Sequence, residues 1–196
     1  AVAASGHDAA TLASVFTSAH GDLAIVDALC TTLAHNPLLL SPTRFHHSVH
    51  NAASGYWAIA AGARAPSTAL SGHLASFAAG LLEAACQCDA DARPVLLAGF
   101  DTDARGALAS VNRSRGLLGV ALVLAPQRSV HSQWSLDWRL ENGPHAAPAP
   151  TVLAALAGNA MADALPLFEV LTGGQAAAFA LPLATNLALA LALQPL

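Results

Sequence analysis

Two runs of strand length contain no polar side chain, VLLAGF (95–100) and GVALVL (119–124). Runs that stay apolar without alternation are typical of strands buried on both faces of a sheet. Helical patterns accompany them, because apolar residues recur every three or four positions over 22–35 and small residues dominate 76–88. Strands that alternate with helices predict an α/β layered fold, in which helices cover both faces of a mixed or parallel sheet.

The remaining segments give weaker patterns. We expect strands over 13–18, 67–71 and 134–140, an extended segment over 41–46, a buried helix over 51–63, a broken helix over 152–171, and loops over 1–10, 89–94, 101–115 and 141–150.

The chain ends in a long apolar run, QAAAFALPLATNLALALALQPL (175–196). Its Leu–Ala alternation with period two favours a pair of buried strands. Its length leaves a membrane span as the alternative. Pro182, Asn186 and the absence of a basic flank argue against the span.

The composition limits the possible functions. Of the 196 residues, 55% are hydrophobic and 10% are charged, whereas about a quarter are charged in an average domain. A membrane protein or a domain with a large buried subunit interface would have this balance. A net charge of −4 argues against a nucleic-acid partner. The three cysteines do not suggest a disulfide framework, which favours a cytoplasmic location.

The stretch STALSGHLASFAAG (67–80) predicts a strand, a tight turn and a helix of small residues. Enzymes use such elbows to present a nucleophile at the positive end of a helix, where an anion is stabilised. This turn contains no cysteine, and its serines do not match the Gly-x-Ser-x-Gly pattern. The chain therefore has an elbow without an evident nucleophile.

Histidines and cysteines form the other candidate sites. The histidines of FHHSVHN (45–51) stand three and four residues apart, as metal ligands on a helix do, but no carboxylate or cysteine is near enough to complete a set. Cys86 and Cys88 form a lone Cys-x-Cys pair. We expect hydrogen-bonded or interface histidines in the first place, cysteines at the end of a buried helix in the second, and no metal site.

Other catalytic patterns are also weak. His20, Asp22 and the many serines can be combined into a Ser-His-Asp triad only on paper, because no serine occupies an elbow. Dinucleotide- and phosphate-binding glycine patterns do not occur, and Gly173 and Gly174 follow a helix instead of a strand. No cofactor is expected.

A pattern of spaced residues runs without a gap over 41–85. Its positions are Ser41, Pro42, Asn51, Gly55, Ile59, Gly62, Arg64, Pro66, Ser76, Glu83, Ala84 and Ala85. With this pattern the segment resembles the core of the β-ketoacyl synthases, which have the thiolase fold. The segments 95–101 and 114–126 resemble the next two core strands of that family. The resemblance implies one domain over 1–196, with an N-terminal thiolase-like half (1–126) and a C-terminal part (127–196) that looks truncated.

The resemblance also locates the missing nucleophile. Counted without gaps from Pro66, the catalytic cysteine of the family falls on Leu74, with His73 and Ser76 beside it. A leucine cannot form a thioester. The synthases also need two His, or a His and an Asn, from their C-terminal half, where this chain has only two histidines, neither in a family motif. The resemblance therefore implies no independent condensing activity.

Within this superfamily, ketosynthase-like subunits without the cysteine are chain length factors, which pair with an active ketosynthase. The chain looks most similar to the short ketosynthase-like proteins of aryl polyene biosynthesis. This implies a heterodimer that acts in polyene, polyketide or fatty-acid-type biosynthesis on chains bound to an acyl carrier protein. Thr43, Arg44, Phe45, Asn51 and Phe77 would then line the interface or the acyl tunnel of the partner.

Two alternatives remain open at this point. An enzyme of the same fold would process acyl thioesters with His73 or Ser71, and the helix N-terminus beside His73 would favour its neutral imidazole. A small apolar binding or membrane-associated protein would share only short strings with the family.

Overall fold

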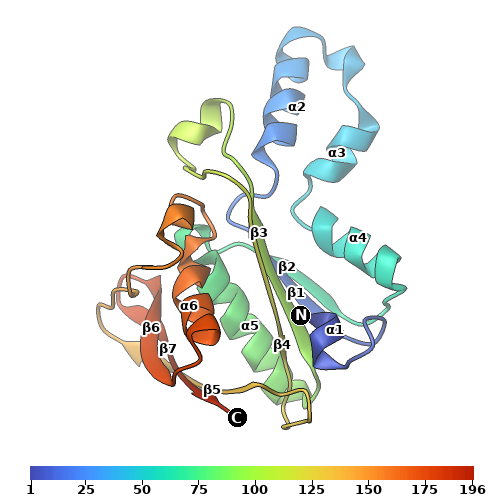
Figure 1. Ribbon diagram of the computed structural model, residues 1–196. Helices are drawn as coiled ribbons and strands as arrows, with labels where there is room; N and C mark the ends of the chain where they lie inside the picture. The colour runs from blue at the N-terminus through green and yellow to red at the C-terminus, as the bar shows by residue number, and fades with distance from the viewer.

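The computed structural model describes residues 1–196, and its strands form two sheets (Figure 1). The strands are β1 (Ala13–Thr17), β2 (Ser67–Leu70), β3 (Val95–Asp101), β4 (Leu118–Leu124), β5 (Trp134–Asn142), β6 (Ala177–Ala184) and β7 (Leu187–Pro195). The α-helices are α1 (Val2–Ser5), α2 (Leu23–His35), α3 (Pro42–Ser48), α4 (Ala52–Ala61), α5 (Ser76–Asp91) and α6 (Leu165–Gly173). Short 3-10 helices are η1 (Pro37–Leu39), η2 (His73–Ala75), η3 (Ala107–Ser110), η4 (Ala154–Leu156) and η5 (Ala162–Ala164).

The larger sheet has the strand order β2-β1-β3-β4 and is mixed, as the sequence predicts. β1 runs parallel to both of its neighbours, with Val15 opposite Thr68 on one side and Leu97 on the other, and β4 runs antiparallel to β3. Because three strands run parallel, their carboxyl ends meet at one edge of the sheet. In α/β folds this edge is the usual place for a ligand site.

The smaller sheet is antiparallel with the order β5-β7-β6. Leu189, Leu191 and Leu193 alternate along β7 and are all buried, which confirms the strand pair predicted for the end of the chain. No helix of the chain has both the length and the apolar character that crossing a membrane requires.

α5 lies between the two sheets and contacts β1, β3 and β6 (Figure 1). It approaches the larger sheet very closely at Gly80, where an added Cβ would lie 2.8 Å from Cγ2 of Thr17 and 3.1 Å from Cδ1 of Leu97. The small residues that mark this helix in the sequence are therefore a packing requirement. α1 and α4 lie on the opposite face of the larger sheet, so helices cover both of its faces.

Several local predictions were wrong. The segment 41–46 is not extended, because Pro42 begins α3 and Ser41 Oγ accepts a hydrogen bond from Arg44 N at 3.3 Å. Proline is well tolerated in the first turn of a helix, where its missing N–H costs nothing. Residues 152–164 form only turns and the 3-10 helices η4 and η5, so the predicted helix begins at Leu165 with α6, and residues 1–10 include the short helix α1.

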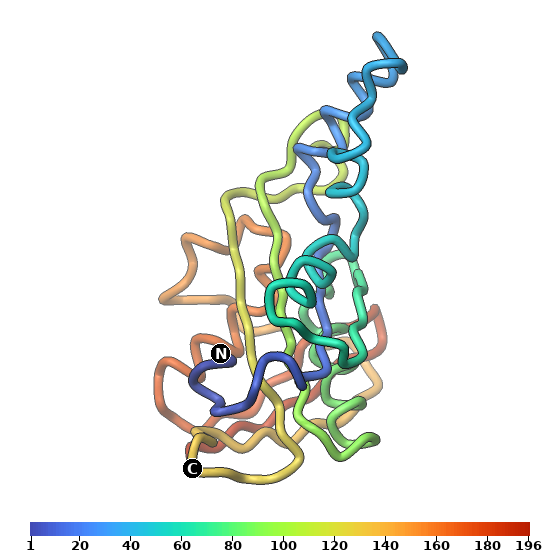
Figure 2. The backbone as a smooth tube through the Cα atoms, turned by 90° about the vertical axis from the view of Figure 1, so that its right-hand side faces the viewer, coloured from blue at the N-terminus to red at the C-terminus, as the bar shows by residue number.

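Two predictions of burial also failed. β4 is an edge strand in which only Leu118 is buried, although its run is wholly apolar. α4 is a helix as expected, but only Ser54 on it is buried. α2, η1, α3 and α4 together form the helical arm (residues 23–61), which extends from the sheet and tapers away from the body (Figure 2). Most side chains of this arm are at least partly exposed, because its helices contact the rest of the chain mainly through α2 on η3 and through α4 on β1 and β2.

The N-terminus of α5 is capped from a distant part of the chain. No side chain at its N-cap position, Ala75, accepts a hydrogen bond, but Oδ2 of Asp163 accepts one from Ala78 N at 3.1 Å. Burial raises the pKa of Asp163 to about 7, and the hydrogen bonds from Ala78 and Phe77 only partly oppose this shift. The other carboxyl oxygen, Oδ1, is buried without a partner.

Gly80→Ala is expected to destabilise the fold by about 1–2 kcal/mol, because the overpacking against Thr17 outweighs the gain in helix propensity. Gly55→Ala in α4 is the matched control, since an added Cβ there meets nothing within 4 Å. The control should stabilise the chain by up to about 1 kcal/mol. Urea unfolding of both variants measures the difference, and equal stabilities would contradict the close approach of α5.

Asp163→Asn is expected to remove a pH dependence of stability. The folded chain holds a proton on Asp163 up to a pH of about 7, whereas the unfolded chain releases it near pH 4. Stability is therefore greatest below pH 4 for this group and falls as pH rises to 7. Asparagine keeps the hydrogen bond from Ala78 N and cannot ionise. The free energy of unfolding, measured in urea between pH 5 and 8, should therefore lose the part of its slope against pH that Asp163 causes. An unchanged slope would assign it to other groups.

Candidate functional site

The elbow between β2 and α5 has the geometry of a nucleophile turn. His73 has a φ of 55°, in the left-handed region that few residues other than glycine adopt. A Cβ on Gly72 would lie 2.8 Å from the carbonyl oxygen of Ala75, so the turn requires glycine there. The predicted strand, turn and helix are thus all present, and the corner between them is as tight as the sequence indicated.

Buried hydroxyl groups hold this corner in place. Ser76 Oγ accepts a hydrogen bond from Gly72 N at 3.1 Å and donates one to the carbonyl of His73 at 2.7 Å. Thr17 Oγ1, at the end of β1, donates to the carbonyl of Ser76 at 2.7 Å. Ser76 is therefore a structural residue of the elbow, and its hydroxyl is not free to react.

The predicted nucleophile position, Leu74, lies on η2 and has 70% of its surface exposed. Beside it, the hydroxyl of Ser71 donates to the carbonyl of Ala19 at 2.9 Å, so its proton points at a carbonyl and not at a base. The contact of Ser71 with His73 is through the backbone, since His73 N donates to Ser71 Oγ at 3.4 Å, and the imidazole is not paired with this hydroxyl. This geometry gives no support to acyl transfer by Ser71.

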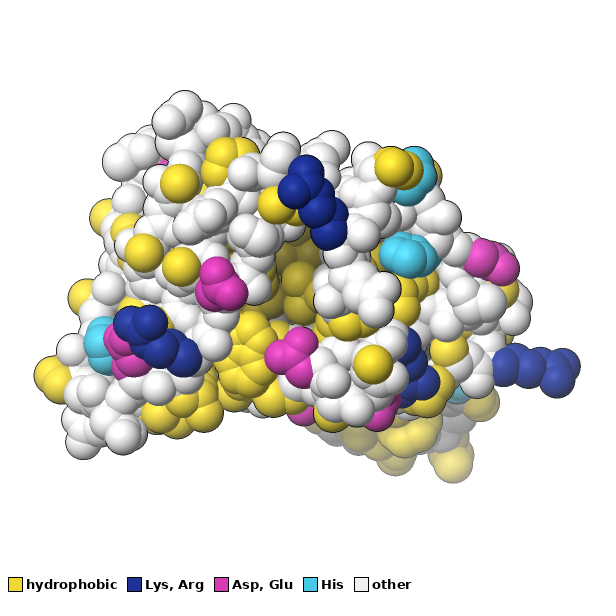
Figure 3. All heavy atoms as spheres, turned by 90° about the horizontal axis from the view of Figure 1, so that it is seen from below, with side chains coloured by type: hydrophobic (Ala, Val, Ile, Leu, Met, Phe, Trp, Pro, Cys, Tyr) yellow, Lys and Arg dark blue, Asp and Glu magenta, His cyan; other side chains and the backbone are white.

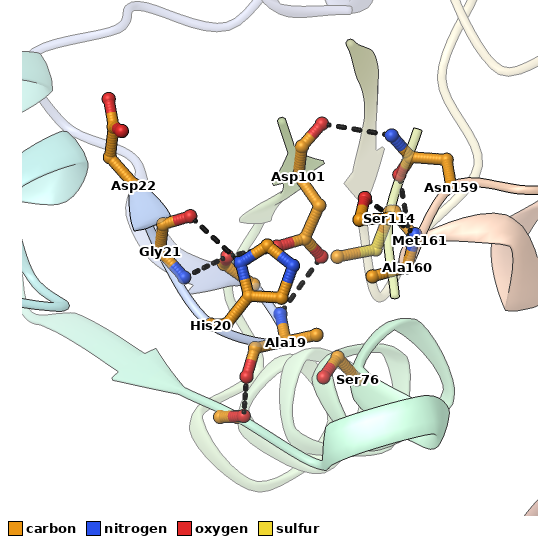
Figure 4. Close-up of polar contacts among 12 residues, drawn as sticks. Ala19, His20, Gly21, Asp22, Ser76, Asp101, Ser114, Asn159, Ala160 and Met161 are labelled. Carbon is orange, nitrogen blue, oxygen red and sulfur yellow. Dashed lines mark hydrogen bonds and ion pairs between the residues drawn. The ribbon is translucent and has the colours of Figure 1, made fainter. Parts of the chain in front are cut away.

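A buried polar cluster lies at the carboxyl edge of the sheet, next to the elbow (Figure 4). Asp101, at the end of β3, is fully buried and accepts hydrogen bonds from Ser18 Oγ at 2.6 Å and Ala19 N at 2.9 Å. His20 Nδ1 lies 3.5 Å from Asp101 Oδ1, and the side chain of His20 is only 4% exposed. The sequence placed Asp101 in a loop, although an aspartate directly after a buried strand could have marked this edge.

Asn159 ties the segment before α6 to the same cluster (Figure 4). Its Nδ2 lies 3.0–3.2 Å from the carbonyl oxygens of Asp101, Arg115 and Gly116, so two hydrogens serve three acceptors. Its Oδ1 accepts from Met161 N at 2.9 Å. The cluster thus joins the ends of strands, and most of its polar atoms are satisfied within the chain.

The positive end of α5, which could stabilise an oxyanion in an enzyme, is already occupied. The carboxyl group of Asp163 takes the N–H of Ala78 there. A substrate oxyanion at this helix end would have to displace Asp163. The elbow therefore lacks a thiol, an activated hydroxyl and a free helix terminus.

The predicted interface residues divide into two groups. Thr43, Arg44, Phe45 and Asn51 are exposed on or beside α3 and α4. Phe77 is wholly buried within the chain, where its ring packs edge-to-face on Phe168 with the centroids 6.0 Å apart.

The histidines near α3 serve separate contacts. His46 and His47 pack edge-on against Tyr56, whereas Nε2 of His50 lies 3.0 Å from the carbonyl of Ser18. No group of three or more His, Cys, Asp or Glu side chains is placed to hold a metal ion.

The other candidates from the sequence are also accounted for by structure. Cys86 is exposed and Cys88 is buried, so the pair does not face one site, and burial raises the pKa of both thiols. Asp22 accepts hydrogen bonds from Ala24 N and Ile25 N as the N-cap of α2. Gly174 ends α6 in a left-handed conformation. No triad or phosphate loop forms from these residues.

A groove of about 640 Å³ lies at the other end of α5, away from the elbow. Cys88, Leu122, Trp134 and Leu171 are among the residues that line it. Figure 3 views this end from below and shows a hollow with hydrophobic side chains in it. None of the elbow residues contributes to the groove.

Comparisons with known proteins identify the fold. A search of curated proteins finds no match to the chain. A solved structure of a ketosynthase in complex with its chain length factor from Xenorhabdus doucetiae matches with a TM-score of 0.71. The match covers 92% of this chain and 69% of the matched chain, at 24% identity, and supports the thiolase-like fold. The family model of the β-ketoacyl synthase N-terminal domain matches residues 1–180, and the chain therefore belongs to the β-ketoacyl synthase family.

Proposed function

We propose that the chain is a non-catalytic, chain-length-factor-type subunit that pairs with an active β-ketoacyl synthase. The observation that carries this proposal is the elbow, which keeps its strained turn and its buried braces but presents Leu74 where the family has its cysteine. A turn of this shape costs conformational energy, so its presence without a nucleophile favours a retained architectural role. The chemistry would belong to the elbow of the partner.

The exposed surface supports a protein partner. β2 pairs only with β1, which leaves its outer edge open next to the elbow, and the helical arm lies beside it. Ketosynthase-type dimers, by the family resemblance, join through this core strand. Exposed apolar side chains gather on these elements: Phe45, Val49, Tyr56, Ile59 and Leu74. Obligate interfaces have this character, because they resemble a domain core cut in half.

The proposed role extends to the partner's substrate. Thr43, Arg44 and Phe45 are exposed on α3, and we propose that they face the acyl tunnel of the synthase and limit its depth. The substrate would then be an acyl chain on a carrier protein, in polyene, polyketide or fatty-acid-type biosynthesis in the cytoplasm. The division into an N-terminal half (1–126) and a C-terminal part (127–196) stays a prediction.

Co-expression with a cysteine-containing β-ketoacyl synthase encoded beside this chain should give a one-to-one complex. Size-exclusion chromatography followed by native mass spectrometry measures the assembly. The open β2 edge and the arm provide the reason, since both bury apolar surface on association. A chain that remains a well-behaved monomer in the presence of the synthase would contradict the proposal.

Phe45→Ala should lengthen the acyl product of the complex, because removing the exposed ring deepens the tunnel that it is proposed to close. Mass spectrometry of the released chains measures product length. Val152→Ala is the control, since Val152 is an exposed apolar residue outside the arm. Products of unchanged length from a stable Phe45→Ala complex would remove tunnel closure from the proposal.

A further inference from the structure

The helical arm has almost no core of its own. Of residues 23–61, only Leu23, Leu29 and Ser54 are buried. Figure 2 shows α2 and α3 reaching away from the two sheets, whereas α4 lies beside the larger sheet. Its helices pack on one another in chain order, α2 on α3 and α3 on α4, and α4 packs on β1 and β2. The tip of the arm, at η1, therefore receives little support from the body of the chain.

Charge is nearly absent from this arm. Asp27 and Arg44 are its only acidic or basic residues other than histidine, whereas a surface in contact with water usually has about a quarter to a third charged residues. Exposed apolar patches of this kind mark surfaces that another molecule covers. The arm is thus built like an interface along its whole length.

Two leucines at the tip expose most of their side chains. Leu38 is 94% exposed and Leu39 is 71% exposed. Their backbone is nevertheless fixed, because Pro37 starts the turn, Leu39 N donates to the carbonyl of Asn36 at 3.0 Å and Leu40 N donates to that of Pro37 at 3.2 Å. A fixed turn that presents apolar side chains loses little conformational freedom when it binds.

We infer that Leu38 and Leu39 are a second anchor for the same ketosynthase partner. The two side chains insert into an apolar hollow on the surface of the partner, at a distance from the elbow of this chain. This inference rests on the proposed function. Continuity argues for one partner, since α4 with Ile59 contacts β2, α3 with Phe45 contacts α4, and α2 contacts both α3 and η1 at the tip. A partner that pairs along β2 lies beside the arm and is in position to cover its end.

The test uses the full chain and the β-ketoacyl synthase encoded beside it, with the dissociation constant measured by titration. Leu38→Glu combined with Leu39→Glu should weaken binding about thirtyfold or more, as loss of a hot-spot pair does. The matched control is Val130→Glu with Val152→Glu, which adds the same charge at side chains that are 96% and 85% exposed elsewhere. The control should keep the wild-type dissociation constant within about twofold.

Two further measurements separate the possible outcomes. Urea unfolding of each variant alone should match the wild type, because all four side chains are exposed, and backbone amides of residues 33–41 should exchange hydrogen more slowly in the complex. If the wild type binds the synthase and the leucine variant has the same dissociation constant, the second anchor is overturned and the proposed function stays intact. The second anchor is also overturned if the leucine variant weakens self-association of this chain but binds the synthase as tightly as the wild type does. No binding by the wild type overturns the proposed function itself.

Discussion

Asp101 ends β3 without any exposed surface, and both of its carboxyl oxygens accept hydrogen bonds from the loop that follows β1. A carboxyl group in this position costs several kcal/mol unless such partners compensate it. Carbonyl oxygens of the same loop accept hydrogen bonds from the hydroxyl of Ser71 in the elbow and from Nε2 of His50 in the helical arm. The main-chain carbonyl of Asp101 accepts one from the side chain of Asn159. Elbow, arm and C-terminal segment are therefore each hydrogen-bonded either to Asp101 or to the loop that its carboxyl group holds.

The sequence predicts those parts of the fold that depend on periodicity. In β7, Leu alternates with Ala because one face of the strand is packed in the core. In α5, the residues are small because much of the helix is buried. It fails where burial depends on partners in space: the apolar run of β4 lies at an edge, and α4 buries only Ser54. Residues 152–164 favour helix by composition, but Asn159 ties that segment to distant carbonyl groups, and α6 begins only at Leu165.

The candidate site divides in the same way. Leu74 lies on the elbow that the sequence predicts, because the elbow is local and its spacing is fixed. Its equivalence to the cysteine of the family stays a prediction. Asp101 and Asp163 escape sequence reasoning because their hydrogen-bond partners, Ala19 and Ala78, lie 82 and 85 residues away. Spacing thus predicts a reactive position, while the groups that occupy the surrounding space are known only from the structure.

The helical arm has a consequence for how such a subunit must be supplied. On the proposed function, the synthase covers these apolar side chains, so copies made in excess would leave them exposed. We expect such copies to be removed by aggregation or proteolysis, which would make the amount of assembled protein follow the scarcer subunit. Balanced synthesis of the two proposed partners would then be a requirement that the near-absence of charge in one arm imposes.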